Sequence, residues 1–298
     1  GLGDVYKRQV VWFLGSAHAA AQEPYLVKNI AAGAASSNPV TLWNVDGSLF
    51  FSADDGSQGE ELWKSDGTPE GTDLVKDINP GKPSSEPIAV AVMNGTLYFY
   101  ANDGTHGMEL WKSDGTPGGT VLVKNIYPGR GNALPFSLTA VKGTLYFHAN
   151  DGLHGKEPWR SDGTEYGTRL IKEIYPGRMN PWPGAMTEVN ERLLFAGDDG
   201  TQGIELWESD GTAGGTRLVK DINPGKESSQ PSYLMGVDAM LFFGADDGAA
   251  GVELWAVAVP NVAYLPLMMD ASGPQGGPAG RRPVSCGPCR FMPELLGR

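Results

Sequence analysis

This sequence has only two cysteines, Cys286 and Cys289, and both lie close to the end of its 298 residues. Residues 22–260 therefore offer neither a disulfide nor a thiolate for a metal, and a fold there has to be held together by packing. Basic side chains are also scarce, 23 against 35 acidic ones, which gives a formal net charge of −12. That charge opposes general attraction to nucleic acid and to anionic membranes, so we expect neither as a partner.

Long apolar runs and helical patterns are missing as well. The run Val10–Leu14 is too short to span a bilayer, which predicts no membrane insertion. No stretch combines a sustained 3.6-residue apolar period with helix caps, so helix should be nearly absent. Glycine and proline are abundant instead, with 42 and 22 copies and no Gly-X-Y period. Frequent turns between short strands account for that excess.

Both ends of the sequence are interpreted separately from its body. Asp4–Gln9 resembles a translated sequencing-library adapter, so residues 1–9 are taken as an artefact. Residues 10–21 are expected to be the remnant of a secretory signal peptide, the alternative being a disordered tail. Residues 261–298 are expected to be disordered or spurious. Their Cys286-Gly-Pro-Cys289 matches the thioredoxin redox motif by letter, but the strand before it and the helix after it are lacking.

The body of the chain, residues 22–260, is a fivefold repeat of 48 residues. Three series of anchors hold this spacing: Trp63, Trp111, Trp159, Trp207 and Trp255; Leu26, Leu74, Leu122, Leu170 and Leu218; and Phe51, Phe99, Phe147, Phe195 and Phe243. Three independent series in one register indicate an array of one supersecondary unit.

Each unit reads as four short strands. In one copy these are Ile88–Met93, Thr96–Tyr100, Glu109–Ser113 and Val121–Ile126, separated by an Asn-Gly turn and by two glycine-rich loops. Four strands repeated in this way are typical of a propeller blade. The fold class we predict is all-β, a five-bladed β-propeller of four-stranded antiparallel blades.

The two ends of the repeat are complementary. The body begins with a lone fourth strand, Tyr25–Ile30, and finishes with a third strand, Glu253–Val257. Together they complete a fifth blade, which predicts a ring closed by the N-terminal strand. The alternative is a piece of a longer open array.

The segments Glu61–Thr68, Glu109–Thr116 and Glu205–Thr212 share the pattern Glu-Leu-Trp-x-Ser-Asp-Gly-Thr. This pattern resembles the bacterial ELWxxDGT repeat family, over residues 25–257, although the third copy departs from it at Pro158. The resemblance implies an exported repeat protein and supplies no catalytic residues. The strand order also resembles kelch-type propellers, and the Ser-Asp-Gly-Thr hairpins resemble the structural Asp-box of sialidases.

Two sets of residues are candidates for binding. The loop between strands two and three carries carboxylates six residues apart, which could offer oxygen ligands to calcium, or could cap the turn and bind loop amides. These residues are Asp55, Glu61, Asp103, Glu109, Asp151, Glu157, Asp199, Glu205, Asp247 and Glu253. Calcium is the only cofactor they suggest. Ser-Asp-Gly-Thr aspartates such as Asp114 are expected to make Asx-turns.

The connection from strand four to the next unit carries the second set. Its basic residues are Lys82, Arg130, Arg178 and Lys226, and its aromatic residues are Tyr127, Tyr175 and Trp182. A cationic ring on an acidic molecule could attract an anionic glycan, and the aromatic rings could stack on sugars. Solvated loop charges and packing at the seam between blades are the structural alternatives.

Nothing in the spacing of the four histidines indicates a Ser/His/Asp arrangement or a zinc site. We therefore expect no enzyme but a secreted or cell-surface monomer that binds an extracellular glycan or protein through repeated sites. The alternatives are a hydrolase with carboxylates at the central channel and a purely structural adhesion or display module.

Overall fold

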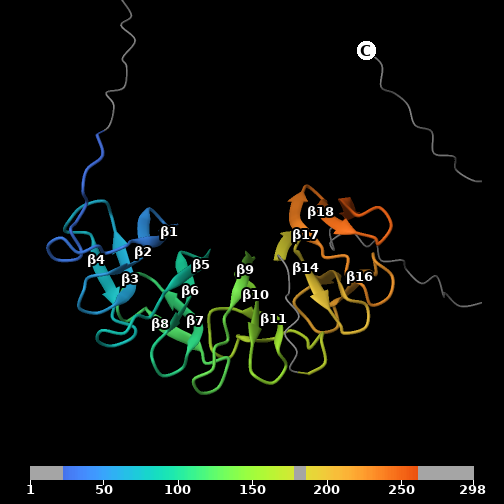
Figure 1. Ribbon diagram of the computed structural model, residues 1–298, viewed down its shortest axis with the longest axis horizontal. Coiled ribbons are helices and arrows are strands. Elements are labelled where there is room, and N and C mark those ends of the chain that lie inside the picture. The colour runs from blue at the N-terminus through green and yellow to red at the C-terminus, as the bar shows by residue number, and fades with distance from the viewer. Residues whose placement is uncertain (1–22, 178–185, 261–298) are drawn as a thin grey trace, which may run out of the picture. The chain divides into compact units, whose positions relative to one another are not determined.

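The computed structural model describes residues 23–177 and 186–260, and every strand lies within them. These residues form five antiparallel sheets and no helix, so the all-β prediction is confirmed (Figure 1). No helix in this described part of the chain is therefore long and apolar enough to cross a membrane.

The sheets follow one another along the chain and are numbered here in that order. The first contains β1 (Val40–Val45), β2 (Ser48–Asp54), β3 (Glu60–Ser65) and β4 (Asp73–Lys76). The second contains β5 (Ile88–Met93), β6 (Thr96–Asn102), β7 (Met108–Ser113) and β8 (Val121–Lys124). The third contains β9 (Phe136–Val141), β10 (Thr144–Asn150), β11 (Lys156–Ser161) and β12 (Arg169–Leu170). The fourth contains β13 (Met186–Val189), β14 (Arg192–Asp198), β15 (Ile204–Ser209) and β16 (Arg217–Lys220). The fifth contains β17 (Ser232–Val237), β18 (Met240–Asp246) and β19 (Val252–Ala258).

The predicted strand at Tyr25–Ile30 is not formed, and the fifth sheet has three strands. A strand exists only through its ladder partner, and this segment pairs with none. It packs instead beside the first sheet, where the Tyr25 hydroxyl donates to the Gly67 carbonyl at 3.1 Å and the Lys28 ammonium donates to the Thr72 carbonyl.

That lysine contact repeats at the three seams that join the first four sheets. Lys76, Lys124 and Lys172 donate to the carbonyls of Thr120, Thr168 and Thr216 at 2.7, 2.9 and 2.8 Å. Lys28 lies the same 44 residues before its acceptor. The N-terminal segment therefore occupies the place that β4, β8 and β12 take beside the sheet that follows each of them.

The core lies between the sheets. One cluster joins Leu62 of the first sheet to Phe99 and Trp111 of the second, and another joins Leu206 of the fourth sheet to Phe243 of the fifth. Phe99, Phe147 and Phe195 are fully buried. The tryptophans of the first four sheets are buried too, because each fills the same gap between adjacent layers.

The loops between strands three and four are held by the predicted Asx-turns. In the second sheet Asp114 Oδ1 accepts the amide of Thr116 at 2.9 Å and its hydroxyl at 2.7 Å. Asp66, Asp162 and Asp210 make the same pair of bonds. These aspartates are structural.

Candidate binding face

The loops between strands two and three are built around an aspartate that bonds to its own turn. In the second sheet Asp103 Oδ1 accepts the amides of Thr105 and His106, both at 2.8 Å. Asp55, Asp151, Asp199 and Asp247 accept the equivalent two amides. Each carboxylate therefore fixes the shape of its loop, which is the structural alternative considered for this set.

The glutamates six residues further on face the opposite way, into the interior. Glu61 is fully buried, and its two oxygens accept the amides of Ile78, Asn79 and Ser85 and the hydroxyl of Ser85. Glu109, Glu157 and Glu205 are buried in the same manner, against Ile126, Ile174 and Ile222. Glu253 is exposed, because no described segment follows the fifth sheet to bind it. Each buried glutamate holds the connection between strand four and the next sheet.

Aspartate and glutamate therefore do not converge on one point. Within residues 23–177 and 186–260, no group of three or more His, Cys, Asp or Glu side chains is placed to hold a metal ion. All of the proposed calcium ligands except the exposed Glu253 accept hydrogen bonds from the protein itself, as Asp55 and Glu61 do.

Burial dominates the protonation of three of the interior glutamates, Glu61, Glu109 and Glu157. It raises the pKa of Glu61 to about 7, against the lowering effect of the Ser85 hydroxyl and the amides of Ile78 and Asn79. It raises the pKa of Glu109 to about 8 and that of Glu157 to about 7. The second repeat has Ala133 where the first has Ser85, so Glu109 lacks the hydroxyl donor that Glu61 has.

The basic residues lie on the connections that these glutamates hold. Lys82, Arg130 and Lys226 are exposed, and each follows a Pro-Gly turn whose glycine has a φ of +96°, +92° or +109°. The described residues record no ion pair for any of the three. Arg178 falls outside the described residues.

These connections pack directly on the loops between strands two and three. A Cβ added to Gly59 would lie 2.7 Å from the carbonyl oxygen of Lys82, and one added to Gly107 would lie 2.1 Å from that of Gly131. Only glycine permits this approach. The two kinds of loop therefore make one surface, called here the binding face, which carries both the loop aspartates and the basic residues.

The aromatic candidates lie at the seams. A Cβ added to Gly152 would meet the Tyr127 ring at 2.7 Å, and one added to Gly200 would meet the Tyr175 ring at 3.2 Å. Asn79 and Asn223 take the same place over Gly104 and Gly248. Tyr127 and Tyr175 are thus partly buried and cover the junction between neighbouring sheets. Trp182 falls outside the described residues.

Two histidine–aspartate pairs on this face were missed by the sequence analysis. His106 Nδ1 lies 2.7 Å from Asp103 Oδ2, and His154 Nδ1 lies 2.7 Å from Asp151 Oδ2. Burial alone would raise the pKa of Asp103, but the bonds from His106 and from two loop amides outweigh it and lower that pKa. The bond to Asp151 raises the pKa of His154. The spacing Asp-x-x-His within an Asx-turn is the signal that could have revealed these pairs.

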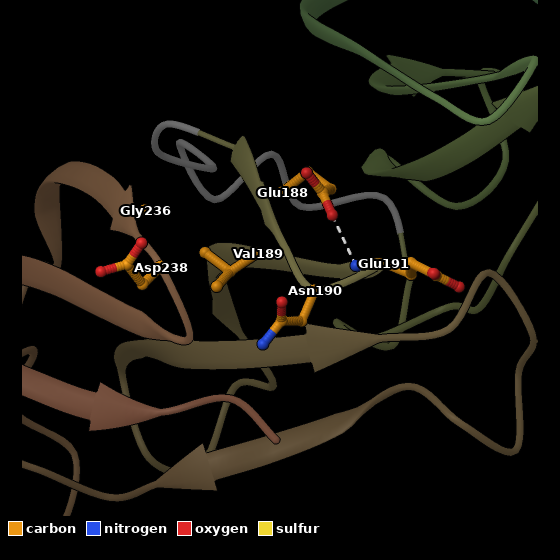
Figure 2. Close-up of a pocket in the computed structure, with 6 residues that line it drawn as sticks. All are labelled: Glu188, Val189, Asn190, Glu191, Gly236 and Asp238. Atoms are coloured by element: carbon orange, nitrogen blue, oxygen red, sulfur yellow. Dashed lines mark hydrogen bonds between the residues drawn. The ribbon is translucent and has the colours of Figure 1, made fainter. Parts of the chain in front are cut away.

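An acidic hollow of about 410 Å³ lies elsewhere, between the hairpin turns of the fourth and fifth sheets (Figure 2). It is lined by Glu188, Glu191 and Asp238, and Glu188 Oε1 accepts the Glu191 amide at 2.5 Å. Glu191 also pairs with Lys142 of the preceding sheet. No residue proposed from the sequence lies in this hollow.

No protein-family model and no curated protein matches this chain. Among solved structures, puromycin hydrolase is 14% identical, with a TM-score of 0.38 over 66% of this chain and 32% of its own. Prolyl oligopeptidase B from Galerina marginata is 12% identical, with a TM-score of 0.45 over 72% of this chain and 30% of its own. A gluconolactonase from Xanthomonas campestris is 13% identical, with a TM-score of 0.35 over 76% of this chain and 86% of its own. The chain spans less than a third of the first two, and similarity at this level carries no activity over to it.

Proposed function

We propose that this protein is an exported, non-catalytic scaffold that binds an anionic extracellular carbohydrate through repeated sites on the binding face. The observation that carries the proposal is the set of exposed cations, Lys82, Arg130 and Lys226, on equivalent loops of an otherwise acidic molecule. Each loop is held from inside by a buried carboxylate, so the cation is presented from a fixed backbone. Repetition of modest sites gives avidity on a polymer whose charges also repeat.

A glycan array of acidic and neutral sugars, probed with the full chain, tests this function. We expect binding to acidic glycans, and its loss in the triple variant Lys82→Gln, Arg130→Gln, Lys226→Gln. The matched control is Lys64→Gln, Lys112→Gln, Lys124→Gln, which removes as much charge from side chains that donate to backbone carbonyls across the seams. Equal loss in both triple variants, or binding to no glycan, would contradict the proposal.

Two further arms address the alternatives. Binding that persists after chelation, with an unchanged melting temperature, would remove the calcium hypothesis. Release of new reducing ends from a bound glycan would show a hydrolase, for which the carboxylates of Figure 2 would be the first residues to change.

We further propose that the five sheets are the blades of a ring that closes in solution. The two end sheets expose the two faces that pair at every internal seam. Leu110 and Leu206 are 0% and 1% exposed against the next sheet, whereas their counterpart Leu254 in the fifth sheet is 76% exposed. On the first sheet, Leu26, Leu42 and Phe51 line an apolar hollow of about 380 Å³. Joining the two faces would bury both.

The turns between strands one and two support the same closure. A Cβ added to Gly95 would lie 2.6 Å from Asp46 Oδ2 of the preceding sheet, so neighbouring turns touch. Gly47 in the first sheet has nothing within 4 Å, and Asp238, the counterpart of Asp46, belongs to the last sheet. A closed ring would place Asp238 over Gly47.

The internal sheets specify the register of the closing strand. Lys64 pairs with Asp73, Lys112 with Val121, and Glu208 with Arg217. Counted in repeats of 48 residues, Ala256 is the counterpart of Lys64 and Tyr25 is the counterpart of Asp73. A closed ring would therefore pair Ala256 with Tyr25 and, by the same count, Trp255 with Leu26. Antiparallel partners lie within the Cα separation that a disulfide requires.

A disulfide scan tests closure in the full chain with Cys286→Ser and Cys289→Ser as background. We expect Tyr25→Cys with Ala256→Cys to form a link within one molecule on oxidation. The out-of-register pair Lys28→Cys with Ala256→Cys should form little of it. Links only between copies, or none with either pair, would contradict ring closure.

A further inference from the structure

The loops that make up the binding face differ in charge from sheet to sheet. In the first sheet the contacting loops carry Asp54, Asp55 and Asp77 together with Lys82, and in the fourth they carry Asp198, Asp199 and Asp221 together with Lys226. In the second sheet two of these three positions are the neutral Asn102 and Asn125, and only Asp103 remains with Arg130. The loops of the second sheet therefore carry one carboxylate at these positions where the loops of the first and fourth sheets carry three.

The asparagine keeps the fold of the loop while removing the charge. Asn102 Oδ1 accepts the Gly104 amide at 2.8 Å, as Asp54 Oδ1 accepts the Gly56 amide at 2.7 Å. The neutral side chain thus accepts the same hydrogen bond within the loop. The difference between these sheets is therefore electrostatic, and it favours an anion at the second sheet.

A histidine adds to this difference. The position of His106 is occupied by Gln58 in the first sheet and by Gln202 in the fourth. Those glutamines donate to Asp77 and Asp221 at 3.2 and 3.3 Å, which shows that this side chain faces the position of Asn125. His106 occupies the position of these glutamines in the repeat, the residue that they contact is the neutral Asn125 in this sheet, and His106 Nδ1 lies 2.7 Å from Asp103 Oδ2.

His106 and Arg130 belong to loops in direct contact. Gly107, the next residue after His106, touches the backbone of Gly131, the next residue after Arg130, and the Met108 amide donates to Asn132 Oδ1 at 2.9 Å. Across the seam, the connection that carries Lys82 reaches the same loop through Asn79, which packs on Gly104.

We propose that the second sheet is the strongest site of the binding face, where His106 and Arg130 together bind a sulfate, phosphate or carboxylate group. The proposal rests on the proposed function, which it refines by making the repeated sites unequal. The charged residues on the elements packed against this loop are Asp103 in the loop itself, the buried Glu109 on β7, Arg130 on the connection that touches the loop, and Asp77 and Lys82 on the connection across the seam.

Binding of the full chain to immobilised dextran sulfate, whose charge does not change with pH, tests the proposal, with uncharged dextran as the blank. At pH 6 we expect Arg130→Gln to weaken binding about tenfold, the scale of one charge-assisted contact. The equivalent change Lys226→Gln should weaken it less than about twofold, because the loops of the fourth sheet carry three carboxylates at the compared positions. Both variants should keep the melting temperature of the parent, since both side chains are exposed.

A second pair of variants tests the histidine separately from the arginine. At pH 6 His106→Gln should weaken binding about threefold, the scale of one hydrogen bond to the anion. His154→Gln should weaken it less than about 1.5-fold, because His154 is flanked by Asp151 and Glu173. Glutamine occurs naturally at this position in two other repeats, so both variants should fold.

The outcomes are distinguishable from failure of the proposed function. No binding of the parent to dextran sulfate would overturn the anionic ligand itself and both proposals with it. Equal losses from Arg130→Gln and Lys226→Gln, or equal losses from His106→Gln and His154→Gln, would overturn the unequal sites while leaving repeated anion binding intact.

Discussion

Each interior glutamate can be buried because loop amides of its own repeat donate hydrogen bonds to its carboxyl group. Glu61, Glu109 and Glu157 are nearly inaccessible, and burial raises the pKa of each to about 7 or 8. The folded state therefore takes up protons that the unfolded chain, with a glutamate pKa of 4.5, has already released. These residues link the stability of the fold to pH.

The sign of that link gives a prediction. The stabilisation from the protonated glutamates is complete below pH 4.5 and is lost as the pH rises through 7 to 8. The free energy of unfolding should therefore fall between pH 5.5 and pH 8.5, by up to about 1.4 kcal/mol per group for each pH unit crossed. Urea denaturation at a series of pH values measures this.

Glu109→Gln is the matched control for this pH dependence, because it keeps the shape of the side chain and cannot titrate. Its slope of stability against pH should be shallower than that of the parent. A parent whose stability rises from pH 5.5 to pH 8.5 would contradict the protonation of these groups.

Only some of the candidate binding residues could be predicted from the sequence. The basic residues stood out because a charge recurs at one position of the repeat, and Lys82, Arg130 and Lys226 are indeed exposed. The glutamates were placed among calcium ligands because spacing along the chain does not reveal that an aspartate and a glutamate six residues apart face opposite ways. The pairing of His106 with Asp103 depends on a turn that brings the imidazole ring back to the aspartate three residues before it.

At the scale of the element, the leucine of the third strand shows how a sheet is held to the next one. Leu110 is 0% exposed and belongs to the cluster that joins the second and third sheets. In that cluster it packs together with Phe147 and Trp159 of the third sheet.

Leu110→Ala should therefore lower the free energy of unfolding by about 2 to 5 kcal/mol, the usual cost of such a cavity. Chemical denaturation measures the change. Leu153→Ala, at an exposed loop position, should alter stability by less than about 0.5 kcal/mol. Comparable losses in the two variants would mean that the seam is not the main source of stability.

Sequence periodicity predicted most elements because alternation and turn chemistry are local. The strand expected at Ile88–Met93 is β5 without a change of bounds, and Val121–Ile126 contains the shorter β8, Val121–Lys124. Tyr25–Ile30 was predicted as a strand from its likeness to those segments. It forms none, because a strand also needs a partner, and that depends on contacts that no local pattern contains.

At the scale of the whole molecule, Leu254 distinguishes an open array from a ring. It is the counterpart of Leu110 but is 76% exposed, with no following sheet packed on it. Closure would bury it between the fifth sheet and the first.

Leu254→Ala should thus cost about 2 to 5 kcal/mol, as Leu110→Ala does, if the ring closes. The measurement is the same denaturation experiment on both variants. A change below about 0.5 kcal/mol in Leu254→Ala alone would show that the last sheet remains open.

A lysine at one position of the repeat has a consequence for how the number of repeats can change. Lys28, Lys76, Lys124 and Lys172 each donate to a threonine carbonyl of the following sheet. Excision of one 48-residue unit between equivalent positions among the first four sheets would leave each remaining lysine of this set with an acceptor of the same kind. These seams are equivalent, so duplication or deletion of a repeat in this register can lengthen or shorten the molecule and still use the same kind of interface between sheets.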